Sequence, residues 1–309
     1  MTLQMQENVP LAPLTTFKIG GPAKYFVEAH SEDEIKEALA VARDKSMPAI
    51  RMGGGSNVLV PDEGLNAFVV FISLTDFKLN GNVLEAGAGC NLLTLIKEAS
   101  QAGLGGWEKL AGIPGTIGGA VRGNAGAFGT EIKDFPVKIR ALHSVTAEIK
   151  EFQNAGCDFA YRHSFFKDNP EWIITNITIE LQTANREDGI RLIEETIAER
   201  ERRHLQNVQA AGSYFMNPVA PAEVVAIFEK EKGMKAREGR VPAGWLIEKA
   251  GMKGAKVGGA IASLQHPNYI VNEGGATARD VKELAEKIKH EVRQQFGIQL
   301  AEEAVVLVV

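Results

Sequence analysis

Apolar residues recur at helical spacing in several segments, and a capping or breaking residue bounds each one. Ser31 precedes an apolar stripe that begins at Ile35. Ser31 and Glu34 form a capping box, in which the serine side chain bonds the N3 amide and the glutamate reaches back. Pro48 ends this helix. Further helices are predicted at residues 91–103, 187–203, 221–233 and 277–297.

Other segments show the patterns of strands. Residues 172–181 alternate between apolar and polar, and residues 67–72 form a continuous apolar run that predicts a buried strand. Residues 49–52 and 304–309 predict two more strands, and residues 137–152 predict a hairpin. Helices and strands are mixed and no repeat is visible, so we expect an α+β fold with more than one sheet.

Composition and charge narrow the class of protein. The 309 residues suffice for about two domains. The net charge is −5 and no basic block occurs, which argues against binding to nucleic acid or to a membrane surface. We see neither a signal peptide nor a membrane-length apolar run, and we expect a cytoplasmic monomer. Two distant cysteines and six scattered histidines predict neither a disulfide framework nor a metal site.

Glycine is over-represented and concentrated in two segments. The chain has 32 glycines, against about 22 at the average usage of ~7%. The run GGGSN at 53–57 can aim successive N–H groups at one anion, although a plain tight turn would read the same. The segment 112–129 holds few side chains, so either an extended cofactor fills the space beside it or it is a hinge. P-loop and Rossmann motifs are absent, but two such loops favour a dinucleotide.

Further motifs follow one another in order over nearly the whole chain. They are TFKIGG at 16–21, GGGSN at 53–57, GIPGTIGGAV at 112–121, NAGAFG at 124–129, YRHS at 161–164, GSYF at 212–215, AGWLI at 243–247 and HPNYIVN at 266–272. In this order, and with the acidic strand around Glu303, they resemble the UDP-N-acetylenolpyruvoylglucosamine reductases. These are flavin enzymes that make UDP-N-acetylmuramate for bacterial cell walls, and the compact chain is similar to their shorter subtype.

The resemblance implies an architecture and a set of ligands. It implies an FAD-binding fold of the vanillyl-alcohol-oxidase/PCMH type, followed by an α+β substrate-binding domain. We therefore expect an FAD-binding domain at 1–203, with subdomains at about 1–70 and 71–203, to which the strand 300–309 returns. The substrate domain is expected at 204–299. The implied ligands are FAD, NADPH and a UDP-sugar enolpyruvyl ether, and FAD is expected to be non-covalent because the first glycine loop lacks histidine.

The resemblance also implies a two-stage reaction and three catalytic residues. NADPH reduces FAD and leaves, and flavin N5 then delivers hydride to the terminal vinyl carbon of the substrate. Arg162 matches the catalytic arginine, which can grip the carboxylate where negative charge spreads. Ser213 matches the proton donor. Glu303 matches the catalytic glutamate, which would orient Arg162 or, when protonated, donate a hydrogen bond. Considered without the resemblance, the three read as a surface ion pair, a turn serine and a strand-edge charge.

Binding residues follow from the matched motifs. The residues implied for FAD are Arg51, Gly53, Gly54, Gly55, Ser56, Asn57, Gly112, Pro114, Gly115, Thr116, Gly118, Gly119, Ala120, Asn124 and Ala125. Candidates for binding the UDP diphosphate and sugar are Tyr161, Asn217 and the arginines Arg200, Arg202 and Arg203. Among the arginines, we predict that Arg203 binds the substrate. These arginines could equally form a solvated helix end, where the helix dipole favours them. Met216 and Leu205 stand where the family often has a basic residue and a proline.

Two other functions were weighed. The first is an FAD oxidoreductase of the same fold that acts on a different substrate and uses oxygen. The second is a catalytically silent nucleotide-binding protein. The ordered motifs around Arg162, Ser213 and Glu303 argue against both.

Overall fold

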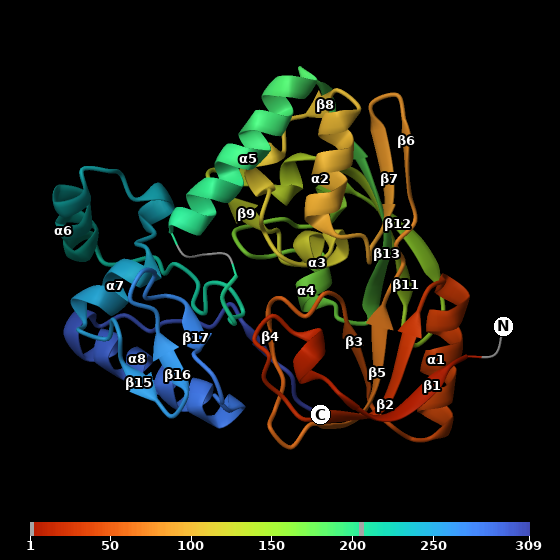
Figure 1. The fold of residues 1–309 in the computed structure, drawn as a ribbon, viewed down its shortest axis with the longest axis horizontal. Coiled ribbons are helices and arrows are strands. Elements are labelled where there is room, and N and C mark those ends of the chain that lie inside the picture. The colour runs from red at the N-terminus through yellow and green to blue at the C-terminus, as the bar shows by residue number, and fades with distance from the viewer. Residues whose placement is uncertain (1–2, 204–206) are drawn as a thin grey trace.

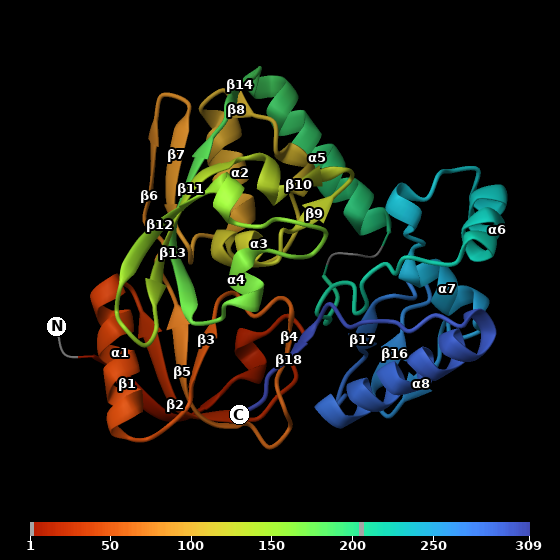
Figure 2. The same ribbon diagram turned by 180° about the vertical axis from the view of Figure 1, so that it is seen from behind.

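A computed structural model describes residues 3–203 and 207–309 (Figure 1). The predictions for Leu205 and for a domain boundary at 204 fall outside these ranges. Two sheets built from the first 200 residues lie on one side of the molecule, and a smaller C-terminal part lies on the other (Figures 1 and 2).

The first sheet is mixed and has the strand order β1-β2-β5-β3. β2 runs parallel to β5, and so does β3, whereas β1 is antiparallel to β2. Helix α1 packs on β2 and β5, and its N-cap Ser31 accepts a bond from the Glu34 N–H at 3.1 Å. The Glu34 side chain reaches back to the N–H of His30, one residue before the predicted partner. The bounds are β1 (Met5–Pro10), β2 (Pro22–Ala29), α1 (Glu32–Asp44), β3 (Ala49–Met52) and β5 (Leu65–Ile72).

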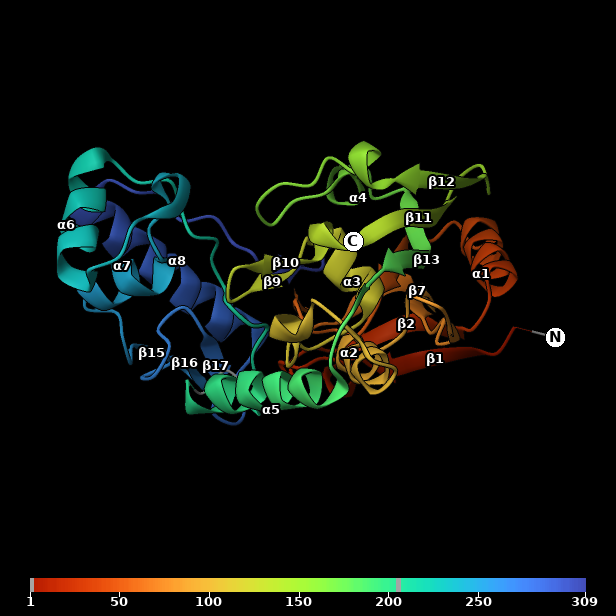
Figure 3. The same ribbon diagram turned by 90° about the horizontal axis from the view of Figure 1, so that it is seen from above.

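The second sheet is antiparallel throughout, with the strand order β12-β11-β13-β7-β6. The predicted hairpin is β11 and β12, and the alternating segment is the central strand β13. Four helices accompany this sheet, and α5 extends toward the C-terminal part (Figure 3). The bounds are β6 (Phe77–Asn80), β7 (Val83–Gly87), α2 (Leu92–Gln101), α3 (Ile117–Arg122), β11 (Pro136–His143), β12 (Ile149–Gln153), α4 (Phe165–Asp168), β13 (Trp172–Glu180) and α5 (Arg186–Arg202).

The C-terminal part has its own apolar core. Phe215, Trp245 and Leu284 are buried in it, and Phe17 and Leu59 from the first 200 residues join the same cluster. Its longest helix, α8, begins at a capping box formed by Thr277 and Asp280. It ends at Gly297, which is in the left-handed conformation. The bounds are α6 (Ala222–Lys232), α7 (Ala243–Lys249), β15 (Lys256–Val257), β16 (Ala260–Ala262), β17 (Ile270–Asn272) and α8 (Ala278–Phe296).

Short paired strands and single 3-10 turns connect these units. The strand pairs are β9 (Gly126–Ala127) with β10 (Thr130–Glu131), and β8 (Leu104–Gly105) with β14 (Gln182–Thr183). The 3-10 turns are η1 (Ala12–Leu14), η2 (Glu108–Leu110), η3 (Ile132–Asp134), η4 (Asn154–Gly156) and η5 (Arg237–Gly239).

The last residues return from the C-terminal part to the first sheet's side of the molecule. β18 (Val305–Val306) pairs in parallel with β4 (Val58–Leu59), and the Val305 N–H donates to the Asn57 carbonyl at 3.0 Å. The prediction of a strand over residues 304–309 is therefore wrong in extent. Only residues 305–306 form the strand, because its partner β4 has two residues, and residues 305–308 also line a cavity.

Neither a membrane-spanning helix nor a metal cluster occurs in residues 3–203 and 207–309. No helix there is long and apolar enough to cross a bilayer. No group of three or more His, Cys, Asp or Glu side chains in these ranges could hold a metal ion. Cys90 and Cys157 are free and buried.

Candidate active site

One cavity of about 800 Å³ is lined by residues from the units of both sheets and from the C-terminal part. The end of β3, helices α3 and α4, and strand β13 contribute lining residues, and so do α5, the loop before β17 and strand β18. A volume of this size is typical of a cofactor or substrate site. The two glycine segments and all three predicted catalytic residues border this cavity.

The two glycine segments pack directly against each other. A Cβ on Gly54 would lie 3.0 Å from the Cα of Gly115, and a Cβ on Gly115 would lie 2.4 Å from Ser56 Oγ. Gly55 has a φ of +62°, and a Cβ there would lie 2.1 Å from the Leu14 carbonyl oxygen. A side chain at any of these three positions would clash with its neighbour, so glycine is needed for this close packing. Close packing of the two segments thus accounts for part of the glycine excess, and a cofactor beside the second segment stays a prediction.

Other parts of the same segments remain open toward the cavity. The only neighbour that a Cβ on Gly119 would meet is Thr116 Oγ1, at 3.6 Å. Both residues line the cavity. In the described residues, the N–H groups of Gly54, Gly55 and Ser56 donate no backbone hydrogen bond. Unused N–H groups that border one cavity form the kind of nest that binds phosphate oxygens. This loop therefore fits the diphosphate of a dinucleotide.

Three arginines line the cavity without an acidic partner. Arg51, Arg122 and Arg200 make no ion pair in the described part of the chain, although the net charge of the protein is −5. Arg200 is only 6% exposed, and its Nε atom has no hydrogen-bond partner. Burial lowers the pKa of all three guanidinium groups. Buried charges are normally paired, so these residues fit an anionic ligand.

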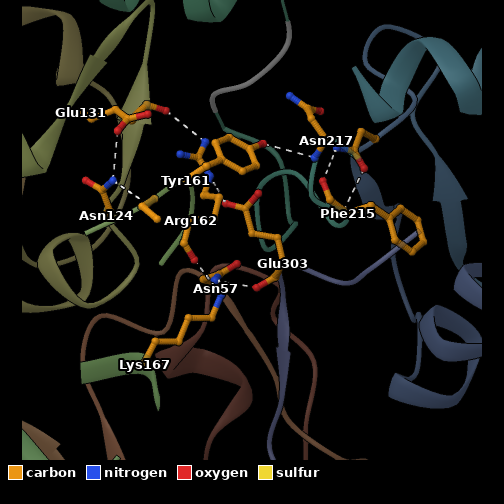
Figure 4. Close-up of polar contacts among 12 residues, drawn as sticks. Asn57, Asn124, Glu131, Tyr161, Arg162, Lys167, Phe215, Asn217 and Glu303 are labelled. Carbon is orange, nitrogen blue, oxygen red and sulfur yellow. Dashed lines mark hydrogen bonds and ion pairs between the residues drawn. The ribbon is translucent and has the colours of Figure 1, made fainter. Parts of the chain in front are cut away.

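Arg162 and Glu303 form an ion pair at the cavity wall (Figure 4). Arg162 Nε lies 2.6 Å from Glu303 Oε1, and Arg162 Nη2 donates to the Gly126 carbonyl at 3.1 Å. Burial raises the pKa of Glu303, while the charges of Arg162 and Lys167 oppose that rise. The guanidinium is thus held in one orientation, with part of its donor edge left for a ligand.

The backbone around Glu303 also positions Ser213. The Glu303 N–H donates to the carbonyl of Tyr214 at 2.8 Å, and the Asn57 side-chain amide donates to the Glu303 carbonyl at 3.0 Å. Ser213 directly precedes Tyr214 and lines the cavity. The neighbouring Glu302 is directed to another partner, since its Oε1 lies 2.7 Å from Lys289 Nζ. One hydrogen-bonded segment therefore links Glu303, Ser213 and the first glycine loop.

Comparison with known proteins agrees with this geometry. Residues 23–148 match the FAD binding domain family, and residues 203–307 match the C-terminal domain of UDP-N-acetylenolpyruvoylglucosamine reductase. The reductase of Solibacter usitatus is 36% identical over 313 residues, covering 97% of this chain and 96% of that protein. The chain belongs to the UDP-N-acetylenolpyruvoylglucosamine reductase family.

Two more relatives support the same assignment. The reductase of Pseudomonas aeruginosa is 34% identical and covers 98% of this chain and 99% of its own length. The crystal structure of the Thermus caldophilus reductase superposes with a TM-score of 0.77 at 31% identity, and it covers all of both chains. The predicted FAD-binding fold, FAD as cofactor and the reductase function are confirmed at the level of the family.

Most residues predicted to contact FAD border the cavity of the reductase. Gly112, Gly115 and Asn124 are the exceptions. Asn124 is fully buried, and its side-chain amide donates to Glu131 Oε2 at 3.0 Å and to the Ala160 carbonyl at 2.8 Å. Its Oδ1 atom accepts from the N–H of Lys133 at 3.0 Å. The side-chain amide of Asn124 is therefore fully used within the protein, and its contact with FAD stays a prediction.

Two of the predicted substrate contacts connect the two sides of the molecule. Tyr161 Oη accepts a hydrogen bond from the Asn217 N–H at 3.2 Å, and neither residue lines the cavity. The Tyr161 ring lies 4.5 Å from the Arg240 guanidinium carbon and 5.3 Å from that of Arg162. The ring therefore separates two cations, one of them the predicted catalytic arginine.

The third predicted substrate contact, Arg203, lies away from the cavity. Its Nε atom pairs with Glu199 at 2.6 Å, and its guanidinium lies over Phe128. Arg200, one turn earlier on α5, lines the cavity instead. Helical spacing explains the difference, because Arg200 shares the buried face of α5 with Ile193 and Thr196.

Sequence reasoning missed four cavity residues: Arg122, Lys167, His266 and Tyr269. His266 and Tyr269 belong to the matched motif HPNYIVN, which could have indicated them. Burial lowers the pKa of His266 and raises that of Tyr269. Arg122 directly follows the motif at 112–121, which could have indicated it, whereas Lys167 lies outside the matched motifs and only the folded chain brings it to the cavity.

Proposed function

We propose that this reductase converts UDP-N-acetyl-3-O-(1-carboxyvinyl)glucosamine to UDP-N-acetylmuramate with electrons from NADPH. The observation that carries the proposal is the Arg162–Glu303 pair, which faces a cavity that Ser213 also borders. When bound, FAD would supply hydride transfer between NADPH and the terminal vinyl carbon of the enolpyruvyl group. The residues of this chain bind, orient and supply charge and a proton.

The FAD diphosphate would be held by the first glycine loop and by two arginines. The free N–H groups of residues 54–56 supply neutral donors, and Arg51 and Arg122 supply positive charge. Arg51 is itself anchored, because its guanidinium donates to the carbonyls of Ala49 and Pro170. A dianion between the two arginines would relieve their mutual repulsion, which contributes to the lowered pKa of Arg51.

Arg162 would grip the substrate carboxylate as negative charge develops beside it. Its guanidinium is planar and permanently charged, and Glu303 fixes its orientation before substrate binds. A preorganised donor of this kind is worth ~3–4 kcal/mol in well-studied enzymes. Glu303 therefore acts through Arg162 when ionised.

Ser213 would give its proton to the carbon next to the carboxylate. A serine hydroxyl is a weak acid, so this transfer needs nearby positive charge and exclusion of water. Arg162 and Arg200 line the same cavity and supply the charge. The bond between Glu303 N–H and the Tyr214 carbonyl fixes the backbone beside Ser213.

The test is anaerobic stopped-flow spectroscopy of the purified yellow holoprotein. NADPH should bleach the flavin absorbance, and the UDP-sugar enolpyruvyl ether should restore it with formation of UDP-N-acetylmuramate. Reoxidation by oxygen but not by this substrate would instead support the alternative of an oxidase. A folded protein that carries no flavin would contradict the proposal altogether.

We further propose that the reductase acts in the cytoplasm as a monomer in peptidoglycan precursor synthesis. We also propose the domain division 1–203 and 204–299, with residues 300–309 returning to the first domain. Most residues of the second apolar core lie between 211 and 304, and this core and the pairing of β18 with β4 support the division. Size-exclusion chromatography with light scattering checks the monomer, and limited proteolysis checks the boundary.

A further inference from the structure

The backbone of Arg162 is in an unusual conformation. Ala160 and His163 exchange two backbone hydrogen bonds, of 3.2 and 3.1 Å, so that Tyr161 and Arg162 occupy the corners of a tight turn. The φ of Arg162 is +55°, in the left-handed region that favours glycine. Such a conformation persists at a functional residue only when surrounding contacts enforce it.

Contacts at both ends of Arg162 enforce this conformation. Its side chain is held by Glu303 and by the Gly126 carbonyl. Its own carbonyl accepts a hydrogen bond from Lys167 Nζ at 2.9 Å (Figure 4). The carbonyl and the guanidinium of Arg162 are thus both held in place. The left-handed backbone conformation is the one in which the residue makes both sets of contacts.

Lys167 is presented to this carbonyl by a well-anchored turn. It lies on α4, where Phe166 is buried, and Ser164 just before this helix donates its hydroxyl to the Arg122 carbonyl at 2.7 Å. Its ammonium group is half-buried at the cavity wall and makes no ion pair in the described part of the chain. A half-buried lysine that donates to a backbone carbonyl and forms no ion pair in the described residues needs an explanation.

The same ammonium also faces the catalytic carboxylate. The charged groups that act on Glu303 are Arg162 and Lys167. Those that act on Lys167 are Glu303, Arg122, Asp168 and Arg162. Burial raises the pKa of Glu303 and lowers that of Lys167, and each group opposes the shift of the other.

We propose that Lys167 is a positioning residue of the reductase. Its ammonium group holds Arg162 in the left-handed turn through the carbonyl, and its positive charge favours the form of Glu303 that pairs with Arg162. This inference rests on the proposed function, since it assigns Lys167 to the substrate half of that reaction. Lys167 donates to the protein and not to the substrate, so it affects kcat and leaves KM nearly unchanged.

Three substitutions separate the hydrogen bond from the charge. Lys167→Arg keeps both, Lys167→Gln keeps a donor but removes the charge, and Lys167→Met removes both. Lys97→Met, at an exposed site on α2, is the matched control. Each holoprotein is assayed for flavin reduction by NADPH and for substrate reduction as a function of pH.

Substrate reduction should slow by about tenfold to a hundredfold in Lys167→Met, because the guanidinium loses its fixed position. The pH at which the rate changes with Glu303 ionisation should rise by about one unit in Lys167→Gln and Lys167→Met, because a nearby cation is lost. Lys167→Arg should retain the wild-type pH profile and most of the rate. Flavin reduction by NADPH should be unchanged in all variants.

Three results would overturn the inference. One is a wild-type rate and pH profile in Lys167→Met. Another is a rise in KM with unchanged kcat, which would make Lys167 a direct substrate contact. The third is an equal effect of Lys167→Arg and Lys167→Met, which would indicate a purely steric role. A wild-type protein that did not reduce the substrate would overturn the proposed function as well, so the two failures are distinguishable.

Discussion

Arg162 Nε and Glu303 Oε1 lie 2.6 Å apart although the two residues are far apart in the sequence. Neither partner is exposed, with 20% and 17% of the side-chain surface accessible. An ion pair that is this close and this buried is sensitive to loss of one partner, because the remaining charge has no substitute. The pair thus ties the orientation of Arg162, the proposed catalytic arginine, to a segment that reaches the cavity from the other side of the molecule.

Arg162→Lys should fold and bind FAD but fail in substrate reduction. A lysine ammonium cannot reproduce two parallel donors, so we expect a loss of roughly 10²- to 10³-fold in this half-reaction. Rapid-mixing measurement of flavin reoxidation by substrate tests it. Arg191→Lys, at an exposed ion pair on α5, is the control and should behave as wild type. Normal turnover in Arg162→Lys would remove the role given to the guanidinium.

Ser213→Ala should separate the two half-reactions. NADPH does not need the serine proton, so flavin reduction should stay near the wild-type rate, while substrate reduction slows by about 10²-fold or more. Ser144→Ala, near the turn between β11 and β12, serves as the control. Equal slowing of both half-reactions would mean that Ser213 shapes the cavity without donating the proton.

Arg122→Gln should weaken FAD binding by about tenfold, which corresponds to about 1.4 kcal/mol, because one charge-assisted contact with the diphosphate is lost. The affinity should also become less sensitive to salt. Fluorescence titration of the apoprotein with FAD measures both. Arg279→Gln, at an exposed site on α8, should leave the affinity unchanged. An unaltered affinity in Arg122→Gln would place the diphosphate elsewhere.

Glu32→Gln should destabilise the fold in a pH-dependent way. The carboxylate accepts bonds from Arg140 at 2.8 and 3.0 Å and from Thr175 at 2.6 Å, and the Arg140 bonds are the main cause of its lowered pKa. Arg140 is 38% exposed, so solvent screening limits the effect at pH 7 to about 1–2 kcal/mol.

The sign of the pH effect follows from the lowered pKa. Stability from ionised Glu32 is fully present above its ordinary pKa of 4.5 and is lost as the pH falls through the lower value in the folded protein. Urea denaturation at several pH values should therefore show the wild type and Glu32→Gln converging in acid. A constant difference down to pH 3 would contradict the assignment.

Asn124→Ala should unfold more easily without directly weakening FAD binding. The substitution removes three hydrogen bonds of a fully buried side chain and leaves the Lys133 N–H without its acceptor, at a cost of about 1–3 kcal/mol. Denaturation midpoints and FAD titration together test this expectation. A folded variant of normal stability with weak FAD binding would restore the role predicted from the sequence.

The fold was largely predictable because its local signals agree with one another. Ser31, Asn91 and Thr277 cap helices as expected, and the alternating segment became β13. The C-terminal strand was overestimated because an apolar run indicates burial without showing what covers it. Here part of the run lines a cavity, and Val308 is 77% exposed.

The candidate site was predictable where motifs carried it and not where packing did. Arg162, Ser213 and Glu303 border one cavity, as the matched motifs implied. The motif does not distinguish the two roles open to Asn124, because a polar residue in a glycine-rich loop has the same sequence signature whether it binds a ligand or stabilises the turn. Lys167 could not be predicted, because nothing in the sequence shows that the Arg162 carbonyl accepts a hydrogen bond from it.

The return of residues 303–306 to β4 has a consequence for synthesis of the chain. The ribosome makes Arg162 and Ser213 well before Glu303, and synthesis proceeds at about 5–20 residues per second. The roughly 140 residues from Arg162 to Glu303 thus take about 7–28 s. Throughout that interval the nascent chain has its glycine loops and Arg162 but lacks Glu303, the carboxylate that pairs with the guanidinium. Under the proposed function, the site is complete only after Glu303 has been made and the residues that follow it have paired with β4.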